Sequence, residues 1–310
     1  MAALMQMPQP AAAGLPCEAP DAAQTLGQSV VEALLDEARL SPKPGLVDSR
    51  GSGAHHDLNL ALMCRSANAL RPAFVAMARA GQQAGAPSLA LRETLGRLGR
   101  DAEATMLASS GGVNTHRGAI WALGLLVAAA AIAPGNNNAA QTAAIAAAIA
   151  KQRDRFAPAQ TGHKGELACR RFKVAGARGQ AQAGFPQVIA HGLPELQRSR
   201  ARGDGETAAR LNALLAILSR LDDTCVLSRC GAATLAQLQQ AAAAVLAAGG
   251  AATLPGRRAL RQLDDLAQAS QASPGGAADL LAATLFLDRL DAVYALRRRA
   301  PLTRRSDADV

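Results

Sequence analysis

The polar, glycine-rich stretch at residues 109–118 is where residue types and spacing first suggest chemistry. It reads Ser-Ser-Gly-Gly-Val-Asn-Thr-His-Arg-Gly and stands directly before the apolar run 119–133. Glycines let a backbone approach an anion closely, and the free N–H groups of a helix beginning there attract negative charge. One interpretation is therefore a cradle for a polyphosphate; the other is an ordinary capped helix start, because this is not a Walker sequence. The candidate phosphate contacts are Gly111, Gly112, Asn114, Thr115, His116 and Arg117.

A second polar segment, residues 41–57, carries one lysine and two aspartates of interest. Lys43 could reach a phosphate as a point charge. Asp48 and Asp57 could hold Mg²⁺, which prefers oxygen ligands. The alternative is a turn in which Asp57 caps the next helix.

The segment 161–186 combines basic residues with glycines. Arg178 stands between Gly176 and Gly179, and a guanidinium fork suits a phosphate in a bidentate manner. Glu166 lies in the same segment. The alternative interpretation is a mobile basic surface loop.

Two more segments place carboxylates near helix starts. In 221–231, adjacent Asp222 and Asp223 would point about 100° apart on a helix, so one could serve a site while the other caps or pairs. Arg229 is either a substrate contact or the partner of one of these aspartates. In 273–279, Asp279 is interpreted as compensation of a helix dipole.

Composition predicts an all-α protein, a single orthogonal helical bundle whose polar, Gly-rich loops form the site. Hydrophobic residues make up 49% of the chain and aromatic residues 2%, and the apolar content is mainly the helix formers Ala and Leu. The 15-residue run at 119–133 is shorter than the ~20 residues that span a bilayer, so we expect a buried core helix and no membrane contact. The expected organisation is a disordered segment 1–23, a helical catalytic domain 24–300 and a basic tail 301–310, with a structureless segment at 157–187.

A net charge of +9 favours anionic partners. The scarcity of aromatic residues argues against binding of single-stranded nucleic acid, where bases stack on aromatic rings. Five scattered cysteines without zinc-site spacing are typical of reduced thiols in a cytoplasm. The carboxylates, cations and glycine turns together suit a phosphorylated substrate with a metal ion.

Six segments, in a consistent order, resemble the ATP:dephospho-CoA triphosphoribosyltransferases. They are SPKPGLVD at 41–48, GAHHD at 53–57, GVNTHRG at 112–118, GARGQAQAGFPQV at 176–188, the segment 223–231, and SPGGAADLL at 273–281. The resemblance implies transfer of the 5-triphosphoribosyl group of ATP to 3′-dephospho-CoA with release of adenine. The product would pass to the transferase that loads an acyl carrier subunit, of malonate decarboxylase or alternatively of citrate lyase.

With this reaction, Asp48, Asp57 and Asp223 become the candidates for Mg²⁺ ligation or sugar chemistry, and Glu166 is the next candidate base. A carboxylate can stabilise the oxocarbenium character that develops when a glycosidic bond breaks. Two alternatives stay open. One is an ADP-ribosyl-type glycohydrolase with water as acceptor; the other is a basic helical regulator that binds nucleic acid.

Overall fold

The computed structural model describes residues 21–135 and 138–299, and it confirms the all-α prediction. No strand occurs in these ranges; the isolated bridge between Asp48 and Gly51 closes a turn. The expected segment 1–23 and tail 301–310 therefore fall almost wholly outside the described residues, although a helix already begins at Ala22. In the first half of the chain the helices are α1 (Ala22–Arg39), α2 (Leu60–Ala69), α3 (Arg71–Ala84), α4 (Leu89–Ser110), α5 (Arg117–Ile132) and α6 (Ala139–Lys151).

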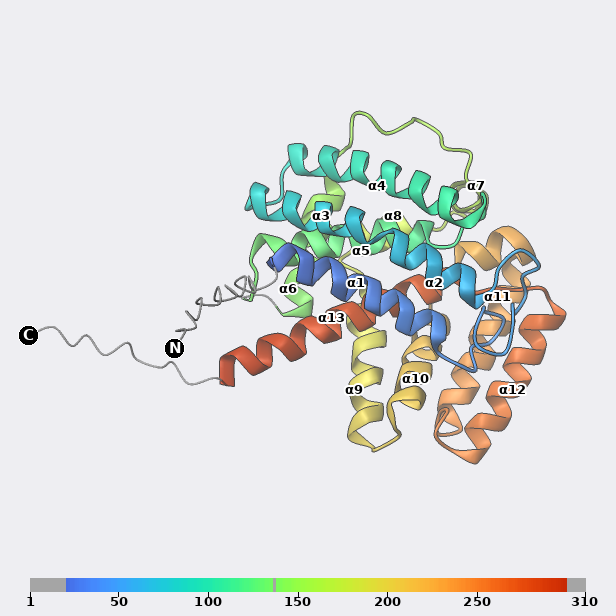
Figure 1. Ribbon diagram of the computed structural model, residues 1–310. Helices are drawn as coiled ribbons and strands as arrows, with labels where there is room; N and C mark the ends of the chain where they lie inside the picture. Colours follow the sequence, from blue (N-terminus) through green and yellow to red (C-terminus); the bar gives the residue numbers. More distant parts are fainter. Residues whose placement is uncertain (1–20, 136–137, 300–310) are drawn as a thin grey trace, which may run out of the picture.

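The second half of the chain is also helical. Its elements are α7 (Lys164–Phe172), α8 (Gly176–Gln182), a π-helical turn (Val188–Gly192), α9 (Leu193–Ala201), α10 (Glu206–Leu218), α11 (Thr224–Ala247), α12 (Leu254–Ala269) and α13 (Gly275–Arg299). In Figure 1, α9 to α12 run across the direction of α1, α3, α4 and α5, and α13 passes between the two sets.

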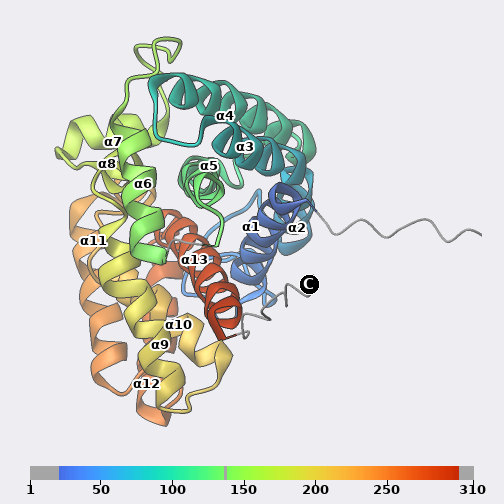
Figure 2. The ribbon, with the colours of Figure 1, turned by 90° about the vertical axis from the view of Figure 1, so that its left-hand side faces the viewer.

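Helix α5 is the centre of the core, as its uninterrupted apolar sequence predicts. Every residue from Ala122 to Ala131 is buried. Figure 2 views α5 nearly end-on, with α3, α4, α1, α13 and α6 around it. Small residues make this packing close: a Cβ at Gly81 of α3 would lie 2.2 Å from the carbonyl oxygen of Ala128 on α5. The second half of α5 is thereby packed closely against α3.

The prediction of a structureless segment at 157–187 is wrong, because α7 and α8 lie within it. Both are short, and their stability comes from packing on longer helices. Helix α7 packs on α11, and α8 packs on α6 and α5. None of the helices in the described part of the chain combines the length and apolar character needed to cross a bilayer.

Candidate active site

Asp223 joins the N-termini of two helices. Its Oδ1 accepts hydrogen bonds from the backbone N–H groups of Cys225 (2.8 Å) and Val226 (3.3 Å) at the start of α11, and its Oδ2 accepts one from Ala277 (2.9 Å) at the start of α13. Only 1% of the residue is exposed. Burial raises the pKa of the carboxyl, and these backbone donors work in the opposite direction. The carboxylate is thus held in place on both sides by helix N-termini.

Asp279 brings a third helix N-terminus to the same place. It lies on α13 and faces the start of α5, where a Cβ on Gly118 would be only 2.1 Å from its Oδ2. The glycine therefore makes room for the carboxylate, which the backbone N–H of Ala119 stabilises. Burial and the nearby charges of Glu37 and Asp223 nevertheless raise the pKa of Asp279 well above its usual value. Two carboxylates therefore lie where α5, α11 and α13 begin.

A buried ion pair borders these carboxylates. The Nζ of Lys43 donates to the Oε1 of Glu37 at 2.5 Å and to the Glu37 carbonyl oxygen at 2.6 Å. Both side chains are at most 5% exposed. Glu37 lies in the last turn of α1, and Lys43 follows in the loop that connects α1 to α2. The loop is thereby tied to the centre of the protein.

His116 completes the buried part of the site. Its Nδ1 lies 3.2 Å from the Ser66 hydroxyl on α2, which shares a 2.6 Å hydrogen bond with the Thr115 hydroxyl. Its Nε2 is buried and has no hydrogen-bond partner among the described residues. Burial, together with the charge of Lys43, lowers the pKa of His116 to about 4. The imidazole is therefore neutral at pH 7 and has one nitrogen free for another partner.

The glycine turn ends α4 and leads into α5. Gly111 and Gly112 adopt φ angles of 67° and 89°, which favour glycine. An added Cβ at either glycine would meet nothing within 4 Å, so the backbone there faces open space. The Asn114 side chain accepts the N–H of Arg117, whose Nε donates to Glu103 at 2.9 Å. The turn thus gives one backbone N–H at the start of α5 a partner, although the N-cap residue His116 forms no side-chain cap, and it leaves the backbone of its glycines accessible.

A histidine and a serine connect the loop before α2 to the start of α13. The Nε2 of His55 lies 2.8 Å from the Ser273 hydroxyl, and its Nδ1 lies 3.6 Å from the carboxylate of Asp57. Burial and the charge of Arg229 lower the pKa of His55. Asp57, Arg229 and Cys225 are exposed. The surrounding protein atoms nevertheless bury the Cys225 thiol. This burial, together with the negative charges of Asp223 and Asp279, raises the pKa of the thiol well above its usual value. These residues form the rim of the site.

Asp48 belongs to the loop that carries Lys43, but its carboxylate is already engaged. It accepts the N–H of Lys43 at 2.8 Å and hydrogen bonds from the backbone and guanidinium of Arg50. Burial raises the pKa of Asp48, but the hydrogen bonds of Arg50 and Lys43 outweigh it and hold the pKa below its usual value. Asp48 therefore stabilises the loop.

Glu166 lies on α7 and Arg178 lies on α8. The Oε2 of Glu166 accepts two hydrogen bonds from Thr161, and its Oε1 pairs with Arg170. Arg178 is exposed, and its charge helps to lower the pKa of Arg92 on α4, where burial is the larger cause. The structure thus gathers the predicted Lys43, His116 and Asp223, with Asp57 and Arg229 at their rim. Glu166 and Arg178 belong to helices that begin beside Thr224, the residue after Asp223, but they form no hydrogen bond with these side chains in the described part of the chain.

Asp48, Asp57 and Asp223 do not form one cluster: within the described ranges, no three His, Cys, Asp or Glu side chains are grouped so as to hold a metal ion. Sequence reasoning missed Glu37, which looked like an ordinary residue of an amphipathic helix. The sequence pattern predicts for Asp279 only the compensation of a helix dipole, although the residue lies in the segment 273–281. The proximity of Asp279 to Gly118 is the signal that the fold adds.

Comparison with known proteins agrees with the resemblance. A family model described as ATP:dephospho-CoA triphosphoribosyl transferase matches residues 23–298. A Klebsiella pneumoniae protein named 2-(5''-triphosphoribosyl)-3'-dephosphocoenzyme-A synthase is 57% identical over 275 residues, 89% of this chain and 98% of the relative. A Stutzerimonas stutzeri protein named "Probable 2-(5''-triphosphoribosyl)-3'-dephosphocoenzyme-A synthase" is 61% identical over 273 residues, 88% of this chain and 94% of the relative.

No solved structure matches the chain. The family model spans nearly all of the described residues, including every side chain placed in the site above. The chain belongs to the ATP:dephospho-CoA triphosphoribosyl transferase family.

Proposed function

We propose that this protein transfers the 5-triphosphoribosyl group of ATP to the 2′-hydroxyl of 3′-dephospho-CoA. The bond between the ribose C1′ and adenine N9 breaks, and a bond forms between that carbon and the 2′-oxygen of the acceptor. The proton of the hydroxyl balances the proton that the leaving adenine takes up. The observation that carries the proposal is the meeting of Asp223 and Asp279 at three helix N-termini, beside the neutral His116.

Asp279 is the best-suited carboxyl for proton transfer. Its raised pKa favours the protonated form compared with an ordinary aspartate, which suits it to give a proton to the leaving adenine. The ionised form that results can accept the proton of the attacking hydroxyl. Asp279 is partly exposed as a residue, whereas Asp223 is 1% exposed and both of its oxygens accept backbone N–H groups. We assign to Asp223 the electrostatic stabilisation of positive charge on the ribose.

Two of the remaining predicted parts of the site, the glycine turn and Arg229, would hold phosphates. The open backbone of Gly111 and Gly112 supports their role as a phosphate cradle. Arg229 is exposed at the rim and can bind a phosphate in a bidentate manner. The free Nε2 of His116 offers a polar contact to a substrate hydroxyl. Lys43 contributes positive charge through its pair with Glu37, without direct substrate contact.

Mg²⁺ fits this site only as an ion shared with the substrate. Mg²⁺ is commonly bound by one or two carboxylates together with phosphates and water. Among the three predicted ligands, Asp57 has an exposed carboxylate, whereas those of Asp48 and Asp223 already accept several hydrogen bonds. Asp57 would therefore hold the ion, which would neutralise part of the triphosphate charge.

Adenine release tests the proposal and separates it from the glycohydrolase alternative. The protein is incubated with ATP and Mg²⁺, with and without 3′-dephospho-CoA, and adenine is measured by chromatography. We expect release that depends on the acceptor. Release without an acceptor would favour the hydrolase, and no release in either mixture would refute both.

The pathway that uses the product is a second proposal. We place the product in the cytoplasm, with the transferase that loads the acyl carrier subunit of malonate decarboxylase. Loading of that subunit in a coupled assay, compared with loading of the citrate lyase carrier, distinguishes the two pathways.

A further inference from the structure

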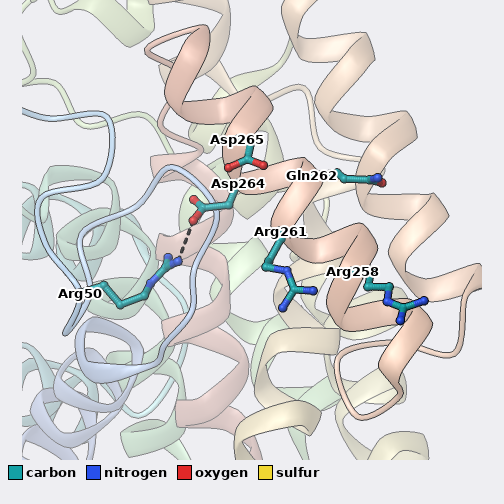
Figure 3. A pocket seen from close by; sticks show the side chains of 6 residues that line it. All are labelled: Arg50, Arg258, Arg261, Gln262, Asp264 and Asp265. Carbon is teal, nitrogen blue, oxygen red and sulfur yellow. Dashed lines mark hydrogen bonds and ion pairs between the residues drawn. The ribbon is translucent and has the colours of Figure 1, made fainter.

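A cavity of about 510 Å³ lies beside α12, against the loop that carries Lys43. Figure 3 shows its lining side chains: Arg50 from the loop, and Arg258, Arg261, Gln262, Asp264 and Asp265 from α12. A neighbouring cavity of about 590 Å³ shares Arg50, Arg261 and Asp264 and reaches the start of α10. Both volumes lie within the range of small-molecule sites, roughly 300–1,000 Å³.

The spacing of the arginines on α12 places them side by side. Arg258 and Arg261 are three residues apart, and Arg257 and Arg261 are four apart, so their side chains emerge from one face of the helix. Arg257 lines the second cavity. All three are exposed. The helix thus presents a row of guanidinium groups to the two cavities.

Most acids at the cavities already have partners. Asp264 accepts hydrogen bonds from Arg50 Nη1 at 2.7 Å and from the backbone N–H of Gly45 at 3.0 Å. Glu206, at the edge of the second cavity, pairs with Arg200 and Arg210. Asp265 is exposed and forms no ion pair with another described residue.

Arg258 and Arg261, by contrast, have no hydrogen-bond or acidic partner in the described part of the chain, and Arg257 uses one nitrogen on the carbonyl oxygen of Ala252 at 2.7 Å. The three guanidinium groups therefore outnumber the single free acid, Asp265.

We propose that this cavity binds the diphosphate group of a small molecule, with Arg258 and Arg261 as its contacts. Two guanidinium groups on adjacent turns, with Cβ atoms about 5–6 Å apart, are close enough for each to bind one of two linked phosphoryl groups. A hollow of this size suits a small molecule better than the extended backbone of a nucleic acid.

The cavity is connected to the active site through Arg50. Its Nη2 donates to the carbonyl oxygen of Lys43 at 3.2 Å, and its Nε donates to Asp48. An anion beside Arg50 would therefore contact the loop whose Lys43 side chain lies among the central carboxylates. The inference rests on the proposed function in one respect: the two molecules that could supply the diphosphate, 3′-dephospho-CoA and ATP, are the proposed substrates.

Calorimetry with inorganic pyrophosphate tests the site directly. The double variant R258Q/R261Q is compared with the wild type and with R97Q, which removes an exposed arginine from α4. Helices α4 and α12 lie at opposite ends of the molecule (Figure 1). Measurements in about 0.1 M salt screen unspecific attraction to the basic surface.

We expect binding to the wild type and to R97Q, and at least about tenfold weaker binding to the double variant, because each charge-assisted hydrogen bond contributes that much or more. Equal affinity in all three proteins, or no binding to the wild type, would overturn the proposal.

The same three proteins are then titrated with 3′-dephospho-CoA and with ATP. A loss of affinity for one of them in the double variant identifies that substrate as the source of the diphosphate. A loss for pyrophosphate alone identifies the cavity as a site for a different diphosphate ligand. Melting curves confirm that each variant is folded. Adenine release is measured separately, so failure of the proposed reaction is distinguishable from failure of this site.

Discussion

The substitution Asp279→Asn tests the assignment of the proton-transfer group, because it removes the charge and keeps the shape. The asparagine oxygen can still accept the N–H of Ala119, so the start of α5 keeps its partner. If Asp279 transfers the proton, adenine release falls by about 10²–10⁴-fold, the usual contribution of a general acid or base. If Asp279 only capped a helix, the substitution would reduce the activity far less.

The same substitution has the opposite effect on stability. The pKa of Asp279 is raised in the folded protein, so the folded state disfavours the ionised form. The resulting destabilisation is absent below the unfolded pKa near 4 and grows as the pH rises through the window up to the folded pKa. We therefore expect Asp279→Asn to melt at the same temperature as the wild type at pH 4 and at a higher temperature at pH 8.

Asp291→Asn is the matched control. Asp291 lies on the same helix, about 18 Å further along, and its Oδ1 accepts the backbone N–H of Ala139 at the start of α6 at 2.9 Å. Burial raises the pKa of Asp291 as well. This variant should shift melting in the same direction and leave adenine release unchanged. Retention of more than a tenth of the activity by folded Asp279→Asn would refute the reasoning.

Three further predictions concern the same site. Gly118→Ala should reduce adenine release strongly, because the new Cβ would lie 2.1 Å from the carboxylate of Asp279. Its control is Gly99→Ala on α4, where an added Cβ meets no atom within 4 Å; this variant should gain up to about 1 kcal/mol of stability in urea unfolding. The lowered pKa of His116, about 4, means that stability falls as the pH drops below about 6.5; the loss should be about 2 kcal/mol at pH 5 and absent in His116→Gln. If the stability of the wild type and of His116→Gln depended on pH in the same way, this prediction would be contradicted. Lys43→Met should cost about 3–5 kcal/mol, because it leaves Glu37 buried and unpaired, and the double variant with Glu37→Leu should recover most of that loss; an additive loss would show that the pair does not interact.

The all-α fold and the buried α5 were predictable because Ala and Leu dominate the chain and the run 119–133 has no polar break. The two helices within the segment 157–187 were not predictable. Helix α7 has nine residues and α8 has seven, too few to show a clear period. Contacts with α11 and α6, which are distant in sequence, stabilise them.

The site was predictable in its parts and not in its arrangement. Lys43, His116 and Asp223 stand in polar, glycine-containing segments, which marks them against an apolar background. Glu37 stands in an amphipathic helix, where a glutamate normally faces solvent, and only the fold shows that it is buried against Lys43. Asp279 has the sequence context of a helix cap. Its role depends on α5, which lies far away in the chain.

Transfer of label from ATP tests the central claim most directly. The protein is incubated with ATP labelled on the γ-phosphate and with 3′-dephospho-CoA. The products are separated, and their masses are measured by mass spectrometry. The reaction at C1′ predicts that the label moves to dephospho-CoA together with the ribose, with one adenine released for each product formed. Label recovered as free ribose triphosphate or as inorganic phosphate, with unmodified dephospho-CoA, would contradict the account.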